Sequence, residues 1–323
     1  MIYRDDVQAV EAFVEKYSQL RSEIAKVIIG QDDVIRDILI SIFSRSHALL
    51  VGVPGLAKTL MITTIAKSLG LSFNRIQFTP DLMPSDIMGT EILDENRKFK
   101  FIKGPVFSNV ILADEINRTP PKTQSALLEA MQERSVSIAG ETHILPNPFF
   151  VLATQNPIEQ EGTYPLPEAQ LDRFMFNILL DYPSVEEEIN IVKSTITRNL
   201  PEPSAVINTE EILFFQNLMQ RIPIVDNVYQ YAVNISVMSR PSTKLAHKWS
   251  DQYLAWGAGP RASQNLIMAA RCHSLLIGKH APDISDVQAV APSILRHRLV
   301  KNYKAEAEGI SVEDIITEFL QSK

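Results

Sequence analysis

The chain has 323 residues, of which 45% are apolar and 21% are charged, and its formal net charge is −7. This length allows two domains with separate cores, and the negative charge argues against general binding to nucleic acids or anionic membranes. The single cysteine excludes an intrachain disulfide. Because we find neither a signal peptide nor an apolar run long enough to span a membrane, we expect a cytoplasmic protein without membrane insertion.

The first part of the chain predicts two helices that lead to a short buried strand. Residues 5–28 place apolar side chains along one helical face, and a second helix is expected from Asp32 to about Ser44. Ile29 and Gly30 lie in the segment that separates the two helices. They either lie over an adenine ring or pack in the core, and the sequence leaves both interpretations open. The strand is the apolar segment 48–51.

A phosphate-binding loop is indicated directly after this strand. The pattern is a strand, a glycine-containing loop and then Lys58 and Thr59 at the start of a helix that ends near Gly70. Backbone N–H groups and the helix dipole favour an anion there. Lys58 would reach the β- and γ-phosphates, and Thr59 would offer a hydroxyl to Mg²⁺. The candidate nucleotide-binding residues are Gly52, Val53, Pro54, Gly55, Leu56, Ala57, Lys58, Thr59 and Leu60.

Ala57 departs from the usual pattern of such loops, because glycine normally precedes the lysine. Alanine tolerates a positive φ poorly but adds only a methyl group, so the loop is compatible with alanine if Ala57 keeps a negative φ. The alternative interpretation of the whole segment is a turn of glycine and proline that happens to precede a helix.

Two adjacent acids mark the next strong signal. A strand over 72–78, an irregular stretch over 79–89 and a hairpin over 90–103, with Asn96 near its tip, come first. The strand over 109–115 then ends in Asp114 and Glu115. Ligands bind at the carboxyl ends of strands in open α/β sheets, so Asp114 is expected to hold Mg²⁺ through water and Glu115 to polarise the attacking water. Solvated acids after a generic strand are the alternative.

A helix over 120–134, a hairpin over 136–145 and another buried strand over 149–156 follow. Asn156 ends this strand and is placed to orient the same water. Alternatively, its side chain caps the turn at Asn156-Pro157.

Arg173 follows a loop over 160–174 and precedes a strand over 174–180. It either pairs locally with Asp172 or Glu168, or projects across a subunit boundary to stabilise charge on a neighbour's γ-phosphate as an arginine finger. The finger is the favoured interpretation.

The rest of the chain is predicted to be helical. After a helix over 184–197, proline density and the loss of periodicity place a linker at 199–206, which separates domains at 1–198 and 207–323. Arg261 follows Gly259-Pro260 at a helix start, where anions bind, and is either a phosphate sensor or a surface arginine. No histidine or cysteine spacing resembles a metal site. The predicted helices are 208–221, 226–240, 260–278, 284–297 and 305–322.

Together these motifs resemble those of AAA+ ATPases, and within them the MoxR family. The resemblance covers about residues 25–300, and alanine commonly stands in that family where Ala57 does. The matching segments, in the family's order, are 52–59 (phosphate loop), 111–118 (Mg²⁺ strand), 154–157 (first sensor), 171–174 (finger) and 259–261 (second sensor).

The resemblance implies an α/β fold: a P-loop αβα sandwich with a parallel sheet, followed by an all-α lid. Residues 79–105 would be the insert that marks this clade and 136–145 its hairpin. ATP and Mg²⁺ would be the cofactors. Such proteins form rings, usually hexamers, and act as chaperone-like machines with partners that carry a von Willebrand factor A domain, in enzyme maturation or in metal or cofactor insertion.

The same resemblance assigns catalytic roles to Glu115, Asn156, Arg173 and Arg261. It leaves open whether Arg261 acts on its own or on a neighbour's nucleotide, and it makes Arg118 and Arg134 further candidates for contacts between subunits. Two rival functions remain: an adaptor that assembles with ATP but hardly hydrolyses it, and a DNA-remodelling motor. The intact Glu115 and Arg173 argue against the first, and the acidic net charge argues against the second.

Overall fold

The computed structural model describes residues 5–93, 95, 97–158, 162–196 and 201–322. Asn96, expected near a hairpin tip, lies outside these residues, as do positions 199 and 200 of the predicted linker. The domain boundary itself therefore stays a prediction.

A five-stranded parallel sheet lies at the centre of the first two thirds of the chain, as the sequence predicted. Its strand order is β2-β5-β8-β1-β9, and each neighbouring pair is parallel. Because Val51 lies opposite Gln155 and Gln77 opposite Asp114, the carboxyl ends of the strands form one edge. The strands are β1 (Ala48–Gly52), β2 (Phe73–Gln77), β5 (Val110–Asp114), β8 (Phe150–Gln155) and β9 (Phe176–Leu180).

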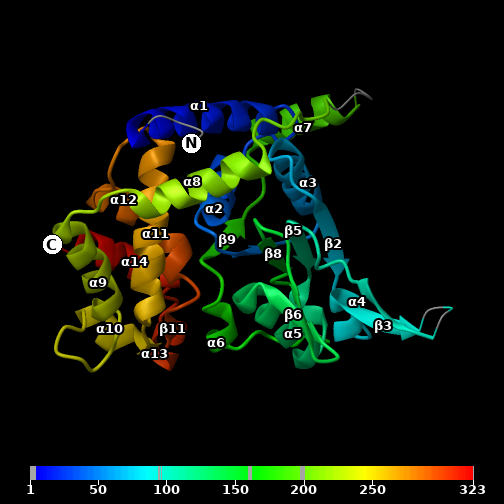
Figure 1. The fold of residues 1–323 in the computed structure, drawn as a ribbon. Helices are drawn as coiled ribbons and strands as arrows, with labels where there is room; N and C mark the ends of the chain where they lie inside the picture. The colour runs from blue at the N-terminus through cyan, green and yellow to red at the C-terminus, as the bar shows by residue number, and fades with distance from the viewer. Residues whose placement is uncertain (1–4, 94, 96, 159–161, 197–200, 323) are drawn as a thin grey trace.

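Helices cover both faces of the sheet, so that alternate residues of its strands enter two different cores (Figure 1). Leu50 packs in the core that includes α1, α2 and α3, whereas its neighbour Leu49 packs in the core under α5. Strands buried on both faces explain the continuous apolar runs of the sequence. These helices are α1 (Asp6–Ala25), α2 (Asp32–Phe43), α3 (Lys58–Ser68) and α5 (Pro121–Glu133).

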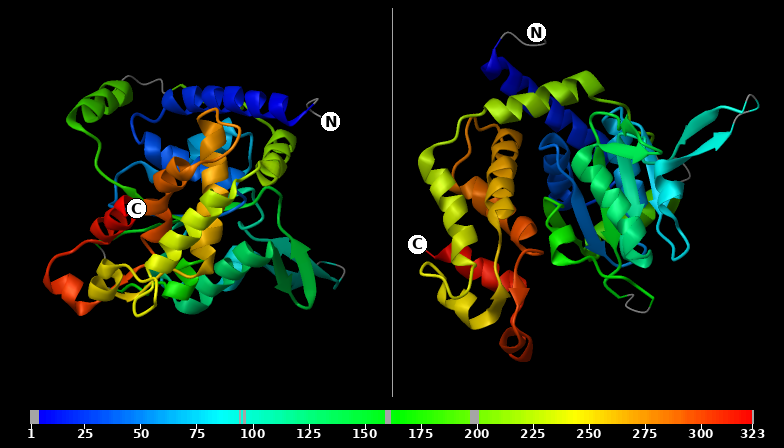
Figure 2. Two further views of the ribbon diagram at one scale, coloured as in Figure 1. Left: turned by 90° about the vertical axis from the view of Figure 1, so that its left-hand side faces the viewer. Right: turned by 60° about the horizontal axis from the view of Figure 1, so that its bottom comes forward.

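Two hairpins and a short helix are inserted between the elements of the sheet. The hairpin of β3 (Gly89–Leu93) and β4 (Phe99–Lys103) projects from the body (Figure 2). The second hairpin, β6 (Ser135–Ile138) and β7 (Glu141–Ile144), contacts it where the ring of Phe101 stacks on His143 at 4.1 Å.

The stretch over 79–89, predicted to be irregular, contains the short helix α4 (Pro84–Met88). Proline fits the first helical turn, and the Asp86 carboxylate accepts a hydrogen bond from the Met83 N–H at 2.8 Å.

Residues 209–321 form the helical lid. The prediction of one helix over 305–322 was wrong, because Gly309 adopts a left-handed φ of 69° after α13 and Ser311 caps the start of α14. A short helix and a two-stranded sheet were also missed. The elements are α8 (Thr209–Arg221), α9 (Asp226–Met238), α10 (Lys248–Tyr253), β10 (Leu254–Trp256), α11 (Pro260–Leu276), α12 (Ile284–Leu295), β11 (Val300–Lys301), α13 (Tyr303–Ala307) and α14 (Val312–Gln321).

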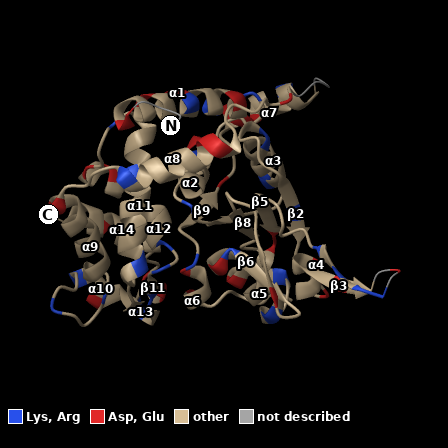
Figure 3. Cartoon of the chain, in the orientation of Figure 1, with Lys and Arg blue, Asp and Glu red and all other residues tan. Residues whose placement is uncertain are grey.

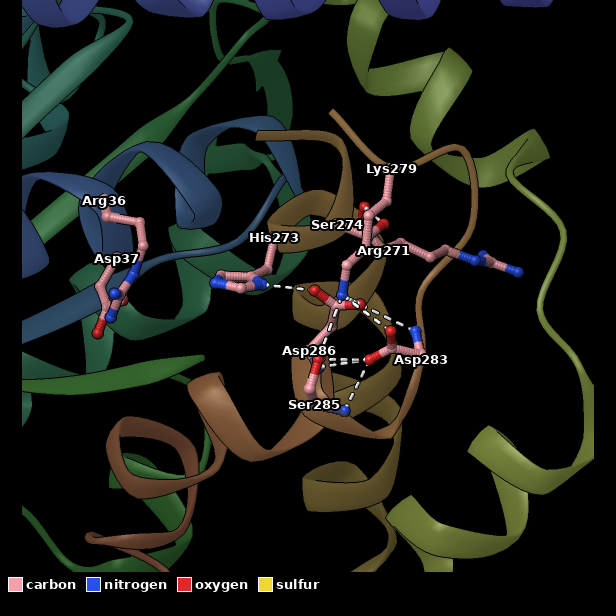
Figure 4. A network of polar contacts seen from close by, with 9 residues as sticks. All are labelled: Arg36, Asp37, Arg271, His273, Ser274, Lys279, Asp283, Ser285 and Asp286. Atoms are coloured by element: carbon pink, nitrogen blue, oxygen red, sulfur yellow. Dashed lines mark hydrogen bonds and ion pairs between the residues drawn. The ribbon is translucent and has the colours of Figure 1, made fainter. Parts of the chain in front are cut away.

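A buried polar network joins α11 to α12 inside the lid (Figure 4). The fully buried carboxylate of Asp286 contacts His273 Nδ1 at 2.8 Å and accepts from Lys279 Nζ at 3.0 Å and from the Asp283 N–H at 2.8 Å. Burying a carboxylate is tolerated only when such partners replace water. The lid therefore has a rigid centre of its own.

Surface charge is mixed, with Lys and Arg interspersed with Asp and Glu over the elements (Figure 3). Within the described ranges, no helix combines the length and the apolar character that crossing a bilayer requires.

His47 packs between the sheet and α5 as a neutral imidazole. Its Nε2 donates to Met131 O at 3.2 Å, and its Nδ1 accepts from the Val151 N–H at 3.0 Å. Burial lowers the pKa of His47 to about 4, because a charged ring would lose its hydration and would turn a second N–H toward that of Val151.

This pKa predicts acid sensitivity. Between pH 6.5 and pH 4 the unfolded chain binds a proton at His47 that the folded chain excludes, so the free energy of unfolding falls by about 3 kcal/mol as pH falls through this range. Denaturant unfolding of the wild type and of His47→Gln, which stays neutral, measures the difference. Parallel pH profiles for the two proteins would refute the assignment.

Candidate functional site

The carboxyl edge of the sheet gathers the residues that the sequence predicted for nucleotide chemistry. Gly52 ends β1, Asp114 ends β5, and Asn156 directly follows β8. Since β5, β8 and β1 are neighbours in the sheet, these three positions lie side by side. The phosphate loop and the two acids therefore share one site.

The phosphate loop approaches the end of β9 closely. A Cβ at Gly52 would lie 2.9 Å from both Cβ and O of Leu180, so only glycine fits this position. Lys58 Nζ donates to Gly52 O, which holds the lysine over the loop. Burial lowers the pKa of Lys58, and the charges of Asp114 and Glu115 oppose this shift. The lysine thus faces the two acids, as nucleotide chemistry requires.

Ala57 adopts a positive φ of 55°, so the condition of a negative φ is not met. The loop reverses at this residue to start α3 at Lys58, and Ala57 O accepts from the Met61 N–H at 2.9 Å as the first helical hydrogen bond. Ala57 is exposed. The helix start therefore imposes a left-handed conformation that costs alanine about 1–2 kcal/mol.

Thr154, which the sequence analysis placed in the first-sensor segment without a role of its own, sets the arrangement of the two acids. Its hydroxyl donates to Asp114 Oδ1 at 2.6 Å and accepts from the Glu115 N–H at 2.9 Å. Glu115 has a left-handed φ of 59° and starts the turn η1 (Ile116–Arg118). The threonine therefore fixes both acids to β8. Its position next to Gln155-Asn156 at a strand end was the available signal.

Arg75 and Gln77 of β2 also contact the acids and were missed. Arg75 Nη2 lies 2.6 Å from Asp114 Oδ2, and Gln77 Nε2 donates to Glu115 Oε2 at 2.8 Å. The two residues are two positions apart in β2, so their side chains point to the same face of the sheet. The sequence did not show that β2 pairs with β5. Without that pairing, contacts of Arg75 and Gln77 with the acids could not be predicted.

The oxygen donors at this edge fit Mg²⁺. Asp114 ends its strand with a carboxylate held from two sides, and Thr59 carries a half-buried hydroxyl in the first turn of α3. Carboxylate, hydroxyl and phosphate oxygens are the ligands that Mg²⁺ prefers. Within the described ranges, no group of three or more His, Cys, Asp or Glu side chains is placed to hold a metal without such a ligand.

Asn156 makes the capping contact that was the alternative interpretation. Its Oδ1 accepts from the Ile158 N–H at 3.2 Å, and the residue is nearly buried. This hydrogen bond fixes the carboxamide at the carboxyl edge and uses only its oxygen. Water orientation by Asn156 stays a prediction.

Ile29 and Gly30 lie beside the same edge. Gln31 Nε2 donates to Asp181 O at 3.1 Å directly after β9. Gly30 lies against Glu187 in the first turn of α7 (Val185–Ile196). Contact of this segment with an adenine ring stays a prediction.

Arg173 and Arg261 lie together, but at the opposite edge of the sheet. Both line a pocket of about 170 Å³ that also contains His47, the residue before β1. Figure 1 shows the chain rising from α6 (Glu168–Leu171) through β9 to α7, so Arg173 lies at the start of β9. Arg173 Nη1 donates to Leu128 O at 2.7 Å, whereas the Asp172 carboxylate contacts Arg298 and Arg261.

The other two candidate arginines lie apart from each other. Arg118 Nη1 lies 3.0 Å from Glu115 Oε2, within its own carboxyl-edge site. Arg134 ends α5 near the amino edge, where its Nη2 donates to Arg45 O at 2.9 Å. Arg134 is therefore the one on the side of Arg173.

Comparison with known proteins supports the resemblance. Residues 47–176 match the family described as ATPase family associated with various cellular activities, and residues 246–319 match the AAA lid domain. Chaperone MoxR1 of Mycobacterium tuberculosis is 46% identical over 302 residues, which cover 93% of this chain and 80% of the relative. Protein MoxR of Methylorubrum extorquens is 32% identical over 87% of both chains.

This chain belongs to the MoxR family of AAA+ ATPases. The crystal structure of a protein from Cytophaga hutchinsonii that is assigned as an ATPase has a TM-score of 0.92 and 42% identity, and it covers 98% of this chain and 96% of that one. The predicted family, the αβα fold with its helical lid and the assignment as an ATPase are confirmed. The individual site residues of this MoxR-family chain stay predictions.

The strain at Ala57 is testable. Ala57→Gly should raise the free energy of unfolding by roughly 0.5–1 kcal/mol, because glycine adopts the left-handed conformation without steric cost. Ala126→Gly, inside α5, should lower it by about 1 kcal/mol. Denaturant unfolding compares the two variants with the wild type. A loss of stability in both would contradict the conformation assigned to Ala57.

Proposed function

We propose that this protein hydrolyses ATP with Mg²⁺ at the interfaces of a homo-oligomeric ring, a hexamer as is usual in its family. The observation that carries the proposal is the separation of the candidate catalytic groups between two edges of one sheet. β9 has five residues, so its two ends lie about 13 Å apart. Arg173 precedes that strand, and the phosphate loop lies at its far end, beyond the reach of an arginine side chain.

A second copy of the chain would bring Arg173 to a phosphate loop that it cannot reach in its own subunit. When the amino edge of one subunit meets the carboxyl edge of the next, Arg173 reaches the neighbour's γ-phosphate. Such a head-to-tail contact closes into a ring if the rotation between subunits allows it. Arg261, in the same pocket as Arg173, would act on the same neighbouring nucleotide.

Within the site, the chain's own groups bind and orient. Backbone N–H groups of residues 52–59 and Lys58 hold the phosphates, and Thr59 and Asp114 hold Mg²⁺, which would neutralise phosphate charge when bound. Glu115 accepts a proton from the attacking water, and Asn156 orients that water. Phosphoryl transfer requires positioning and charge stabilisation rather than covalent catalysis, so these groups suffice.

The name of the mycobacterial relative supports a chaperone role for this chain. We assign it to the maturation or remodelling of client proteins, including metal or cofactor insertion, in the cytoplasm and together with a protein that carries a von Willebrand factor A domain. The projecting β3–β4 hairpin and the β6–β7 hairpin are the surfaces that would press on the partner.

One variant should lose ATP binding, and a second should bind ATP but hydrolyse it slowly. Lys58→Ala should lower ATP affinity by at least about 100-fold, because a charge-assisted contact with the phosphates is lost, whereas Lys67→Ala on the exposed face of α3 should not. Glu115→Gln should keep the affinity and lower kcat by about 10²- to 10⁴-fold. Calorimetry and a phosphate-release assay measure both. Unchanged affinity in Lys58→Ala, or wild-type turnover in Glu115→Gln, would refute the respective role.

Catalysis between subunits predicts complementation. Arg173→Ala should bind ATP normally but lose about 10³-fold or more in kcat. Mixed with Glu115→Gln, it should regain activity, because some interfaces combine an intact nucleotide site with an intact Arg173. The wild-type rate per subunit should rise with protein concentration as light scattering reports assembly in ATP. A rate per subunit that does not change with concentration, from a protein that stays monomeric in ATP, would refute the ring model.

A further inference from the structure

One buried arginine of the lid holds the backbone segment that carries Arg173. Arg298 follows α12 and is only 6% exposed. Its Nη2 donates to Asp172 O at 3.2 Å and to Phe174 O at 2.8 Å, and its Nη1 donates to Met175 O at 3.2 Å. We call residues 172–175 the finger segment. Three of its four carbonyl groups therefore accept from a single lid side chain.

The remaining donors of Arg298 are also used. Its Nε donates to Asp172 Oδ1 at 2.7 Å, and its Nη1 donates to Ile294 O of α12. A guanidinium has five N–H donors in a rigid plane, so all five have acceptors here. Such a fork fixes the distance and the orientation between α12 and the finger segment.

Asp172 extends this contact to the second arginine. Its Oδ1 binds Arg298, and its Oδ2 lies 3.7 Å from Arg261 Nη1 at the start of α11. Arg173, the next residue, lines the same pocket as Arg261. One carboxylate thus connects the finger segment to two different helices of the lid.

We propose that Arg298 and Asp172 are positioning residues that make the lid and the finger segment one mechanical unit. This inference rests on the proposed role of Arg173 between subunits. The pair sets where Arg173 and Arg261 stand relative to each other, so that any movement of the lid displaces Arg173 at the neighbour's nucleotide.

Arg298→Lys tests the proposal. Lysine keeps the charge but has three donors on a flexible stem instead of the rigid fork. Because the phosphate loop lies at the other edge, the KM for ATP should stay unchanged while kcat falls by about 10- to 100-fold, the penalty of a small misplacement. Arg296→Lys is the matched control: this lid arginine donates to Asn177 O, outside the finger segment, and should keep kcat.

Complementation separates positioning from general damage. Arg298→Lys should regain activity when mixed with Glu115→Gln, whose Arg173 is intact, because the defect belongs to the arginine side of the interface. If Arg173→Ala is complemented and Arg298→Lys is not, the positioning role fails while the proposed function stands. If neither is complemented, catalysis between subunits itself fails.

Asp172→Asn provides a second variant, because its partly exposed side chain keeps an oxygen for Arg298 and loses only the negative charge. It should lower kcat with unchanged KM. Thermal unfolding should fall below that of the wild type, because the buried Arg298 loses its counter-charge, but should stay above the assay temperature. A kcat equal to that of the wild type in both Asp172→Asn and folded Arg298→Lys would overturn the proposal.

Discussion

Parallel register is the constraint on which the rest of this structure depends. In a parallel sheet, the residues that follow each strand lie at the carboxyl end of the sheet, and the residues that precede each strand lie at its amino end. The phosphate loop, the acids and Asn156 all follow strands, and Arg173 precedes one. A single chain therefore holds its candidate catalytic groups at two opposite ends of the sheet, and in the proposed ring these groups meet between subunits.

The strand pattern, the phosphate loop, the acid pair and the order of the motifs were predictable, because each is a local signal in which residue type dictates backbone geometry. The conformation of Ala57 was not, since the requirement comes from how the loop enters α3. Thr154 and Arg75 escaped notice because their roles depend on which strands are neighbours. The break at Gly309 was misjudged because a single glycine inside a helical pattern is ambiguous. Arg298 lies 125 residues from Arg173 in the chain, and only packing brings them together.

Buried charge explains why the lid contact is built from arginine. Burial lowers the pKa of Arg298, and the carboxylate of Asp172 opposes that shift. Removing one partner of such a pair leaves an uncompensated charge, so the pair stabilises a single arrangement rather than a range of them. The five N–H donors of Arg298 bind carbonyl and carboxylate oxygens, so they fix the orientation of the contact and also stabilise it.

The two edges are also connected within one subunit by α5. Gln124, buried near the start of α5, donates to Ile116 O directly after the acid pair, and Leu128 O accepts from Arg173 further along. At the far end, Met131 O accepts from His47 at the amino edge. Gln124 and Leu128 are four residues apart, or about 6 Å along the axis of this helix. If the proposed site is correct, α5 would link the acids to Arg173, and Arg298 would link the lid to the adjacent backbone. The finger segment is therefore the place where the contacts from α5 and from Arg298 meet.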